Sequence, residues 1–420
     1  MLQDIDPAVP ILDGLQFDTR HYHFGLYDAQ GRPKLAARLI EKGGVAALKH
    51  VAAQGDPGRV RAPVVARRAR PILITGGAGF IGCNLADSLA ADGHDVLIFD
   101  SLHRFGVEDN LEWLRRRHPK RVSVAIADVR DGLAVDEAVG DAAAVFHFAA
   151  QVAVTTSMNA PDEDFEVNAR GTLNVLEAAR RRDHMPPIIF ASTNKVYGDL
   201  SAHDFEIVGD QWCPVDPDLR AKGVSERQPL HLCTPYGCSK GTADQYVLDY
   251  AKSFGVPTAV LRMSCIYGPR QFGTEDQGWV AHFLMRARSG EAIAVFGDGR
   301  QVRDILHVSD AVAAYRLLLD NIAILKGRAF NLGGGPANAV SLLQVIAEIE
   351  RVLGRDVPCH FDEMRPGDQR WYVSDTAAFA QATGWRSRIG WRNGLRDLDR
   401  ALDAMEVAEP GRRRAGKAVA

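Results

Sequence analysis

The chain has 420 residues, a formal net charge of −3, 46% hydrophobic residues and 25% charged residues. These values are ordinary for a globular protein of two or three domains, and they give no indication of a nucleic-acid partner. No apolar run approaches the ~20 residues that a membrane span needs, and the N-terminus lacks the pattern of a secretion signal, so we expect a cytoplasmic protein with no membrane contact.

The N-terminal part does not share the pattern of the rest of the chain. We expect residues 1–53 to form an appendage of unknown role and residues 54–70 to form a linker, because the latter are rich in Gly, Pro and Arg without a hydrophobic period. His21 and His23 alternate on a strand-like run, but no third ligand stands near them. The six cysteines contain no C-x-x-C pair. No metal site is therefore predicted.

The stretch from Pro71 to Asp100 has the pattern of a dinucleotide-binding unit. An apolar run at 72–74 predicts a buried parallel strand, and a glycine-rich turn, a helical pattern and a second apolar run follow it. The turn contains Gly76, Gly77, Gly79 and Gly82. Such glycines permit a tight turn and let the backbone approach a pyrophosphate, which helix N–H groups bind. The carboxylate of Asp100 accepts hydrogen bonds from an adenosine ribose and repels a 2′-phosphate, so the predicted cofactor is NAD rather than NADP.

Strands and helices continue to alternate as far as residue 262, which predicts an α/β fold with a doubly wound parallel, Rossmann-type sheet. Further strands are expected at 122–126, 144–148, 188–190 and 258–262, and long helices at 162–182 and 235–254. Ligands of such sheets bind beyond the carboxyl ends of the strands. The residues expected at those ends are Asp128, Gln151, Thr193 and Arg262.

After Tyr267 the alternation weakens, and loops rich in Pro and Gly separate short helical patterns near 278–290, 309–321 and 341–353. We therefore predict an NAD-binding domain with the catalytic residues over 71–265 and a smaller C-terminal α/β lobe, mainly for substrate binding, over 266–405. Residues 406–420 are basic and poor in apolar residues, which predicts a disordered tail.

Tyr236 and Lys240 are spaced i, i+4 in a helical stretch, so both side chains lie on one face. A lysine ammonium close to a phenol favours the phenolate and lowers the pKa of the tyrosine toward the range of a base. The same lysine can hold the nicotinamide ribose. Ser192 and Thr193, at a predicted strand end, can supply a second hydrogen bond to a sugar hydroxyl. Y-x-x-x-K alone is common by chance, but this context favours catalysis over a solvated helix face.

Over residues 71–405 the chain resembles the extended short-chain dehydrogenase/reductases, in their nucleotide-sugar epimerase branch. The resemblance rests on TGGAGFIG (75–82), ADVRD (127–131), HFAA (147–150), NARGTLNVLEAAR (168–180), STNKVYG (192–198), PYGCSK (235–240) and YGPRQ (267–271). It implies a catalytic triad of Thr193, Tyr236 and Lys240, and a nucleotide-diphosphate sugar as substrate.

The same resemblance assigns the binding residues. Asp128 and Val129 are expected to contact the adenine, and Asn168 to order the nicotinamide side. The predicted cofactor-binding set is Gly76, Gly79, Phe80, Ile81, Gly82, Asp100, Asp128, Val129, Ala149, Ala150, Gln151, Asn168, Tyr236 and Lys240. The predicted substrate-binding set is Thr193, Asn194, Lys195 and Gln151 at the hexose, with Arg303 and Arg365 at the pyrophosphate because guanidinium groups bind phosphate bidentately.

Within this branch, the stretches 149–157, 233–252 and 262–283 are most similar to enzymes that convert CDP-paratose to CDP-tyvelose. Two differences from better-known members of the branch agree with this similarity. The 4,6-dehydratases carry an Asp-Glu pair after the catalytic Thr, which protonates and expels a hydroxyl, and here Asn194 and Lys195 take those positions. The usual sugar epimerases carry an Asn that helps to bind the substrate diphosphate where Cys265 stands, so we expect a different substrate placement.

The implied reaction is a transient oxidation at C2, after which the sugar turns over and hydride returns to the opposite face, with NAD retained. A UDP-hexose 4-epimerase, or another nucleotide-sugar enzyme of the family, is the alternative. A non-catalytic NAD-binding scaffold is the alternative from a different class. The presence of Thr193, Tyr236 and Lys240 argues against it, because a scaffold does not need an activated tyrosine hydroxyl. Pairing through the two long helices, common in the family, predicts a homodimer or homotetramer. The sequence alone leaves open the nucleotide base, the deoxy pattern of the sugar and the carbon inverted.

Overall fold

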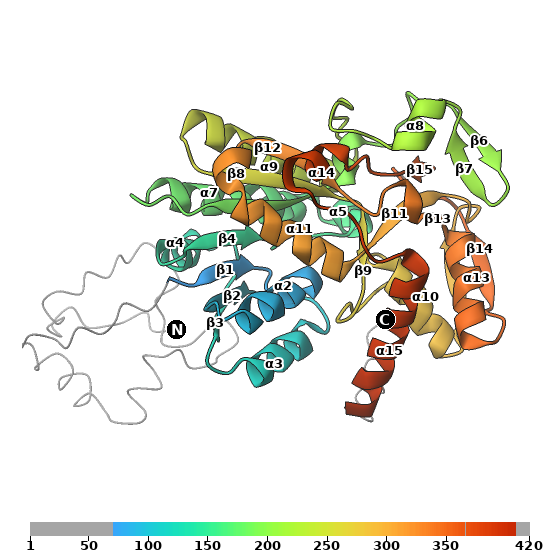
Figure 1. The fold of residues 1–420 in the computed structure, drawn as a ribbon, viewed down its shortest axis with the longest axis horizontal. Coiled ribbons are helices and arrows are strands. Elements are labelled where there is room, and N and C mark those ends of the chain that lie inside the picture. Colours follow the sequence, from blue (N-terminus) through green and yellow to red (C-terminus); the bar gives the residue numbers. More distant parts are fainter. Residues whose placement is uncertain (1–69, 366, 409–420) are drawn as a thin grey trace, which may run out of the picture. The chain divides into compact units, whose positions relative to one another are not determined.

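The structure is a computed structural model that describes residues 70–365 and 367–408. The predictions for residues 1–69 and 409–420, including His21 and His23, lie outside the described residues. The described chain forms a parallel sheet with helices on both faces, together with a smaller lobe (Figure 1).

The central sheet has seven parallel strands in the order β12-β8-β5-β4-β1-β2-β3. Their bounds are β1 Ile72–Thr75, β2 Val96–Asp100, β3 Val122–Ile126, β4 Ala144–His147, β5 Ile188–Thr193, β8 Thr258–Met263 and β12 Arg328–Leu332. Chain order reverses between β1 and β4, and it is at such a switch point that Rossmann-type sheets bind dinucleotides. The predicted fold class is confirmed.

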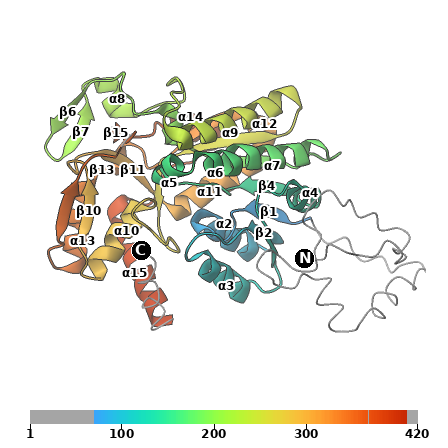
Figure 2. The same cartoon turned by 180° about the vertical axis from the view of Figure 1, so that it is seen from behind.

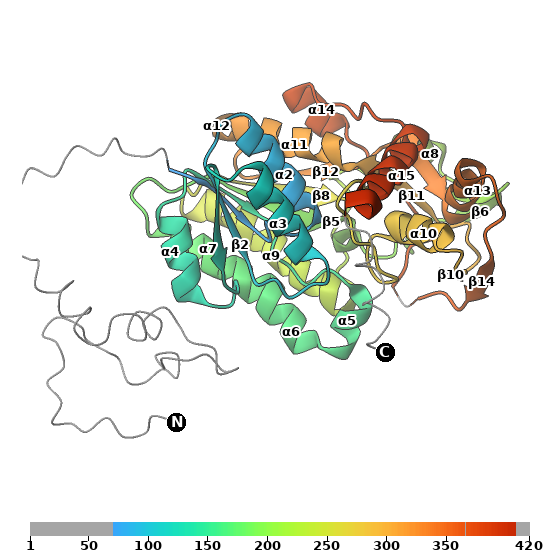
Figure 3. The same ribbon diagram turned by 90° about the horizontal axis from the view of Figure 1, so that it is seen from below.

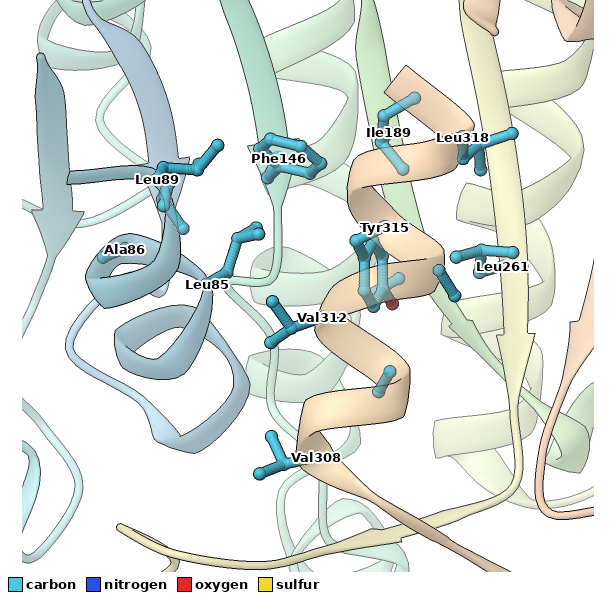
Figure 4. Packing of buried hydrophobic residues seen from close by; sticks show 14 of the residues in the cluster. Leu85, Ala86, Leu89, Phe146, Ile189, Leu261, Val308, Val312, Tyr315 and Leu318 are labelled. Atoms are coloured by element: carbon cyan, nitrogen blue, oxygen red, sulfur yellow. The ribbon is translucent and has the colours of Figure 1, made fainter. Parts of the chain in front are cut away.

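Two apolar layers cover the faces of this sheet, because successive residues of each buried strand point to opposite sides. Ile74, Phe146 and Ile189 face one layer, to which α2 and α11 contribute (Figure 4). Leu73 and Val145 face the other. The first layer contains α2 Phe80–Ala91, α3 Val107–Arg117, α11 Val308–Asp320, α12 Ile322–Leu325 and α14 Ala377–Thr383. The second, seen from behind in Figure 2, contains α4 Gly132–Gly140, α7 Gly171–Arg180 and α9 Thr234–Ser253.

The smaller lobe is built around a second sheet in which β11 pairs with β13, β15 and β9 (Figure 1). A separate parallel pair joins β10 and β14 (Figure 3), and an antiparallel hairpin joins β6 and β7. The bounds in this lobe are β6 Phe205–Val208, β7 Gln211–Pro214, α8 Pro217–Lys222, β9 Cys265–Tyr267, α10 Trp279–Arg288, β10 Ile293–Phe296, β11 Val302–His307, β13 Ala339–Ser341, α13 Leu342–Leu353, β14 Cys359–Asp362, β15 Trp371–Tyr372 and α15 Trp391–Ala408, with short 3₁₀ turns at Asn194–Tyr197 and Pro336–Asn338.

Two sequence predictions need correction. The helix expected over 162–182 is broken into α6 Pro161–Phe165, a π-helical turn Glu166–Arg170 and α7, after the short α5 Val154–Asn159. The extra residue of the π turn lets the buried Asn168 side chain bond across to Gln151. The boundary predicted at residue 265 is also too simple, because α11 and β12 return to the central sheet.

Candidate active site

A cavity of about 730 Å³ lies where the carboxyl ends of the central strands meet the smaller lobe. Its wall contains the predicted catalytic residues and every predicted cofactor- and substrate-binding residue except Asn168. The wall also contains residues that the sequence did not single out for a binding role. These are Gln271, Phe272, Glu275, Asp276, Phe296, Gln301 and Asp368, with others.

The glycine corner between β1 and α2 leaves room that any side chain would fill. Gly76 has φ +66°, and a Cβ there would lie 2.7 Å from the backbone nitrogen of Ala149. A Cβ on Gly82 would meet the carbonyl oxygen of Gly76. Gly79 caps α2 without a side-chain hydrogen bond, and no acidic residue stands in the first turn of that helix. The first residues of α2 line the cavity, and their N-terminal amides therefore form an anion site that suits a pyrophosphate.

Asp100 closes the ribose end of this corner. Its two carboxylate oxygens accept hydrogen bonds from Ala78 N at 3.0 Å and Leu102 N at 2.9 Å. Burial raises the pKa of this carboxyl, and the backbone hydrogen bonds oppose the rise. Asp128 lies at the next strand end, paired with Arg130 at 2.8 Å. The corner therefore fits a dinucleotide, and its carboxylate at the ribose disfavours a 2′-phosphate.

The catalytic candidates come from β5 and α9. Tyr236 is 8% exposed, and its phenol forms a hydrogen bond with Thr193. Lys240, one helical turn later, donates from Nζ to the carbonyl oxygen of Ala191 at 2.7 Å and lies 4.2 Å from the ring centroid of Phe190. A buried phenol, a hydroxyl and an ammonium group thus meet at the end of β5.

Burial shifts the pKa values of both the phenol and the lysine. Burial raises the pKa of Tyr236 to about 12, although the bond with Thr193 opposes the rise. Burial also lowers the pKa of Lys240 to about 7. The causes of the shift at the phenol are burial, Thr193 and Asp164, while the ammonium of Lys240 is directed at a carbonyl oxygen and a ring. The lowering of the phenol's pKa by Lys240 therefore stays a prediction.

The two residues after Thr193 point into a polar cluster contributed by the smaller lobe. The Nδ2 of Asn194 donates to Gln369 Oε1 at 3.3 Å. The Nζ of Lys195 lies 3.1 Å from Asp368 Oδ1, and the same oxygen accepts from an Nη of Arg303 at 2.6 Å. Burial favours protonation of Asp368, but the two cations outweigh it and hold the pKa of this carboxyl well below its ordinary range. Sequence reasoning found both cations and missed the carboxylate that joins them.

Arg365 was predicted to bind a pyrophosphate, and its guanidinium lies on the cavity wall. It stacks 3.8 Å from the ring centroid of Phe296 and pairs with Glu275 at 3.0 Å and Asp276 at 3.4 Å. An anionic ligand would compete with these carboxylates for the guanidinium. Cys265, at the position where relatives were expected to carry Asn, accepts from the indole N–H of Trp279 at 3.4 Å.

A hydrogen-bonded network joins Asn168, Gln151 and Asp164 beside the cavity. The amide of Asn168 accepts from Gln151 N at 2.9 Å and donates to Gln151 O at 3.0 Å. The side chain of Gln151 is used internally, since its Nε2 donates to Ala153 O at 2.8 Å and to Asp164 Oδ1 at 2.9 Å. Asp164 also accepts from the hydroxyl of Ser239. No local pattern in the chain indicates a role for this buried carboxylate.

A second buried hydrogen-bond network, centred on Asp244, holds the end of β5. Asp244 accepts from two guanidinium nitrogens of Arg262, at 2.8 and 2.9 Å, and from Ser192 Oγ at 2.7 Å. Arg262 also donates to the hydroxyl of Tyr197 at 3.1 Å. The hydroxyl of Ser192 therefore donates its proton within the protein, and Ser192 also lies on the cavity wall.

The described chain offers neither a membrane span nor a cluster of metal ligands. Within residues 70–408, residue 366 aside, no helix is long and apolar enough to cross a membrane. In the same part of the chain no group of three or more His, Cys, Asp and Glu side chains could hold a metal ion.

The family model of the NAD dependent epimerase/dehydratase family matches residues 72–333. The chain belongs to this family, and it is an NAD-dependent enzyme, in agreement with the glycine corner and Asp100. Among its relatives, CDP-paratose 2-epimerase of Salmonella typhi is 40% identical over 334 residues, which are 78% of this chain and 97% of that protein. A putative UDP-glucose 4-epimerase of Methanocaldococcus jannaschii is 32% identical over 328 residues, 77% of this chain and 96% of that protein.

A solved structure agrees with this assignment. The UDP-glucose 4-epimerase of Thermus thermophilus, in complex with NAD, is 29% identical with a TM-score of 0.66, and the match covers 79% of this chain and 99% of that one.

Proposed function

We propose that the chain inverts one carbon of the hexose in a nucleotide-diphosphate sugar, and that its reaction is the conversion of CDP-paratose to CDP-tyvelose at C2. The observation that carries the proposal is the meeting of Tyr236, Thr193 and Lys240 at the wall of a cavity. Its lining also includes Lys195, Arg303 and Arg365, which could bind a diphosphate and which pair with carboxylates of the same wall. The similarity to the Salmonella typhi enzyme over nearly its whole length supports the choice of substrate.

In this proposal the phenolate of Tyr236 takes the proton from the hydroxyl on the carbon to be inverted. Thr193 holds the phenol oxygen in place, and Lys240 supplies a nearby positive charge. The glycine corner and Asp100 would hold NAD, which would supply reversible hydride transfer at that carbon and a positive charge that opposes the burial raising the pKa of the phenol. The protonated Tyr236 then returns its proton to the sugar oxygen, and because the hydride would also be returned, the sugar ends at its original oxidation state.

The residues after Thr193 favour epimerisation over dehydration. Expulsion of a hydroxyl as water needs an acid that can donate a proton. Asn194 and Lys195 stand beside the threonine, and the carboxylate that reaches Lys195, Asp368, is kept ionised by Arg303 and Lys195. A ketone formed in this cavity is therefore poorly placed to eliminate water.

Proton NMR of purified protein incubated in D₂O with CDP-paratose or with UDP-glucose tests both the substrate and the reaction type. We expect CDP-paratose to reach equilibrium with its C2 epimer without deuterium at C2, because the hydride stays on the enzyme. Turnover of UDP-glucose alone would assign the chain as a 4-epimerase. Deuterium incorporation at the inverted carbon would contradict transient oxidation, and a stable 4-keto-6-deoxy product would show a dehydratase.

A further inference from the structure

Asp164 is a buried carboxylate that the proposed reaction does not use. It is 1% exposed, and it lies in α6 immediately before the π turn. All of its hydrogen-bond partners are neutral: Oδ1 accepts from Gln151 Nε2 at 2.9 Å and from Asn168 Nδ2 at 3.1 Å, and Oδ2 accepts from Ser239 Oγ. Burying a carboxylate whose hydrogen-bond partners are all neutral is costly. We therefore expect a cationic group on which this charge acts.

The catalytic helix carries the ionisable groups that face this carboxylate. Helix α6 packs against α5, the π turn and α9. The sequence of α5, VTTSMN, has no ionisable residue, and Glu166 and Arg170 of the π turn are exposed. From α9, the charge of Asp164 acts on both Tyr236 and Lys240.

Two carboxylates stabilise the ammonium of Lys240, but they are not equivalent. Asp244 is already paired by two hydrogen bonds with Arg262, so its charge is largely matched. Among the described residues, no cation forms a hydrogen bond or ion pair with Asp164. Burial raises the pKa of Asp164, and Lys240 is the cation whose charge opposes that rise. Asp164 is therefore the carboxylate with the less compensated charge near the catalytic lysine.

The hydrogen bonds of Asp164 also join two walls of the site. Ser239 lies between Tyr236 and Lys240 in sequence, and its bond to Asp164 fixes that turn of α9. Gln151 lies on the cavity wall, and its bond to Asp164 fixes the loop after β4.

We propose that Asp164 is a positioning residue of the catalytic centre, which joins α9 to the loop after β4 and supplies the negative charge facing Lys240 and Tyr236. This inference rests on the proposed roles of Tyr236 and Lys240. It predicts that the charge of Asp164, and not only its hydrogen bonds, sets the pH range in which the pair works.

The variant Asp164→Asn separates charge from hydrogen bonding. Its amide oxygen can accept from Gln151 and Asn168 as before. Its amide nitrogen can donate to the Ser239 hydroxyl. That hydroxyl can then donate to the backbone carbonyl oxygen of Tyr236, which is already 3.2 Å away. Loss of the charge removes repulsion from the phenolate and stabilisation from the ammonium, so both groups should lose their protons at lower pH. We expect both limbs of the kcat/KM profile to move to lower pH by about 0.5–1 unit.

An ultraviolet titration of the phenolate in the NAD-loaded protein gives a readout that needs no substrate. The signal of Tyr236 is the difference between wild type and Y236F, and between D164N and the double variant D164N/Y236F. We expect the phenolate of Tyr236 to titrate with a lower midpoint pH in D164N than in the wild type. If D164N does not accumulate as folded protein, D164S replaces it, and the same lower midpoint is expected. Asp162→Asn, an exposed neighbour on the same helix, is the matched control and should leave the midpoint unchanged.

An equal midpoint in wild type and in a folded, neutral variant at position 164 would overturn the proposal. So would a kcat/KM that falls by the same factor at every pH, because that is the result of a purely structural role. If the wild type converts no nucleotide sugar, the proposed function fails, and the titration still decides the role of Asp164.

Discussion

Replacing Asp244 with Ala should destabilise the protein strongly, because it leaves the buried guanidinium of Arg262 without its carboxylate. Asp244 is 0% and Arg262 5% exposed, and two hydrogen bonds of 2.8 and 2.9 Å join them. After the substitution, the hydroxyl of Tyr197 at 3.1 Å is the acceptor that remains for Arg262 among these contacts. Breaking one side of a buried pair costs about 3–5 kcal/mol, a large part of the ~5–15 kcal/mol by which a typical protein is stable.

Urea unfolding at constant pH measures this loss. Asp249→Ala removes an exposed carboxylate from the same helix and should change the free energy of unfolding by less than about 0.5 kcal/mol. The double variant Asp244→Leu/Arg262→Met removes both charges, so it should recover most of the loss. A loss below about 1 kcal/mol for Asp244→Ala, or a double variant less stable than the single one, would refute the reasoning.

Three further predictions follow from the site. Gly76→Ala should abolish copurification of NAD, measured by mass spectrometry after denaturation, because the added Cβ would lie 2.7 Å from the backbone nitrogen of Ala149; a variant that retains NAD would contradict the glycine corner. Asp368→Asn removes the carboxylate that holds Arg303 and Lys195 in place, so kcat/KM for the nucleotide sugar should fall about tenfold or more with unchanged NAD content, because these two side chains are no longer fixed against the substrate; an unchanged kcat/KM would refute this role. Burial lowers the pKa of His147 to about 3 from 6.5, so the unfolded state binds the extra proton between these values, and stability should fall by about 1.5 kcal/mol from pH 6.5 to 5 through this residue alone. His147→Gln should flatten that slope in urea unfolding, and an equal slope would contradict the assignment.

The strands and the cofactor corner could be predicted from sequence because their signals are local. Buried parallel strands are short apolar runs, and the turn at Gly76 is encoded by residues adjacent in the chain. The spacing of Tyr236 and Lys240 is likewise one turn of a single helix, α9. Such features depend little on how distant parts of the chain meet.

The electrostatics of the site could not be predicted in this way. The carboxylate of Asp368 reaches Lys195 across 173 positions, and Asp164 reaches Ser239 across 75. The partner of the Lys240 ammonium could not be predicted for the same reason. The i, i+4 spacing places Lys240 on the same helix face as Tyr236, but Ala191, on β5, accepts the bond from its ammonium. The π turn before α7 contains Asn168, whose bonds to Gln151 no local pattern shows.

The most direct test of the central claim is the turnover of Tyr236→Phe, a variant that keeps the ring and removes the hydroxyl. NAD content and thermal unfolding, measured on the same sample, should match those of the wild type. Loss of the proton acceptor should lower kcat by about 10²–10⁴-fold at every pH. Conversion of nucleotide sugars at the wild-type rate by folded, NAD-loaded Tyr236→Phe would contradict the account.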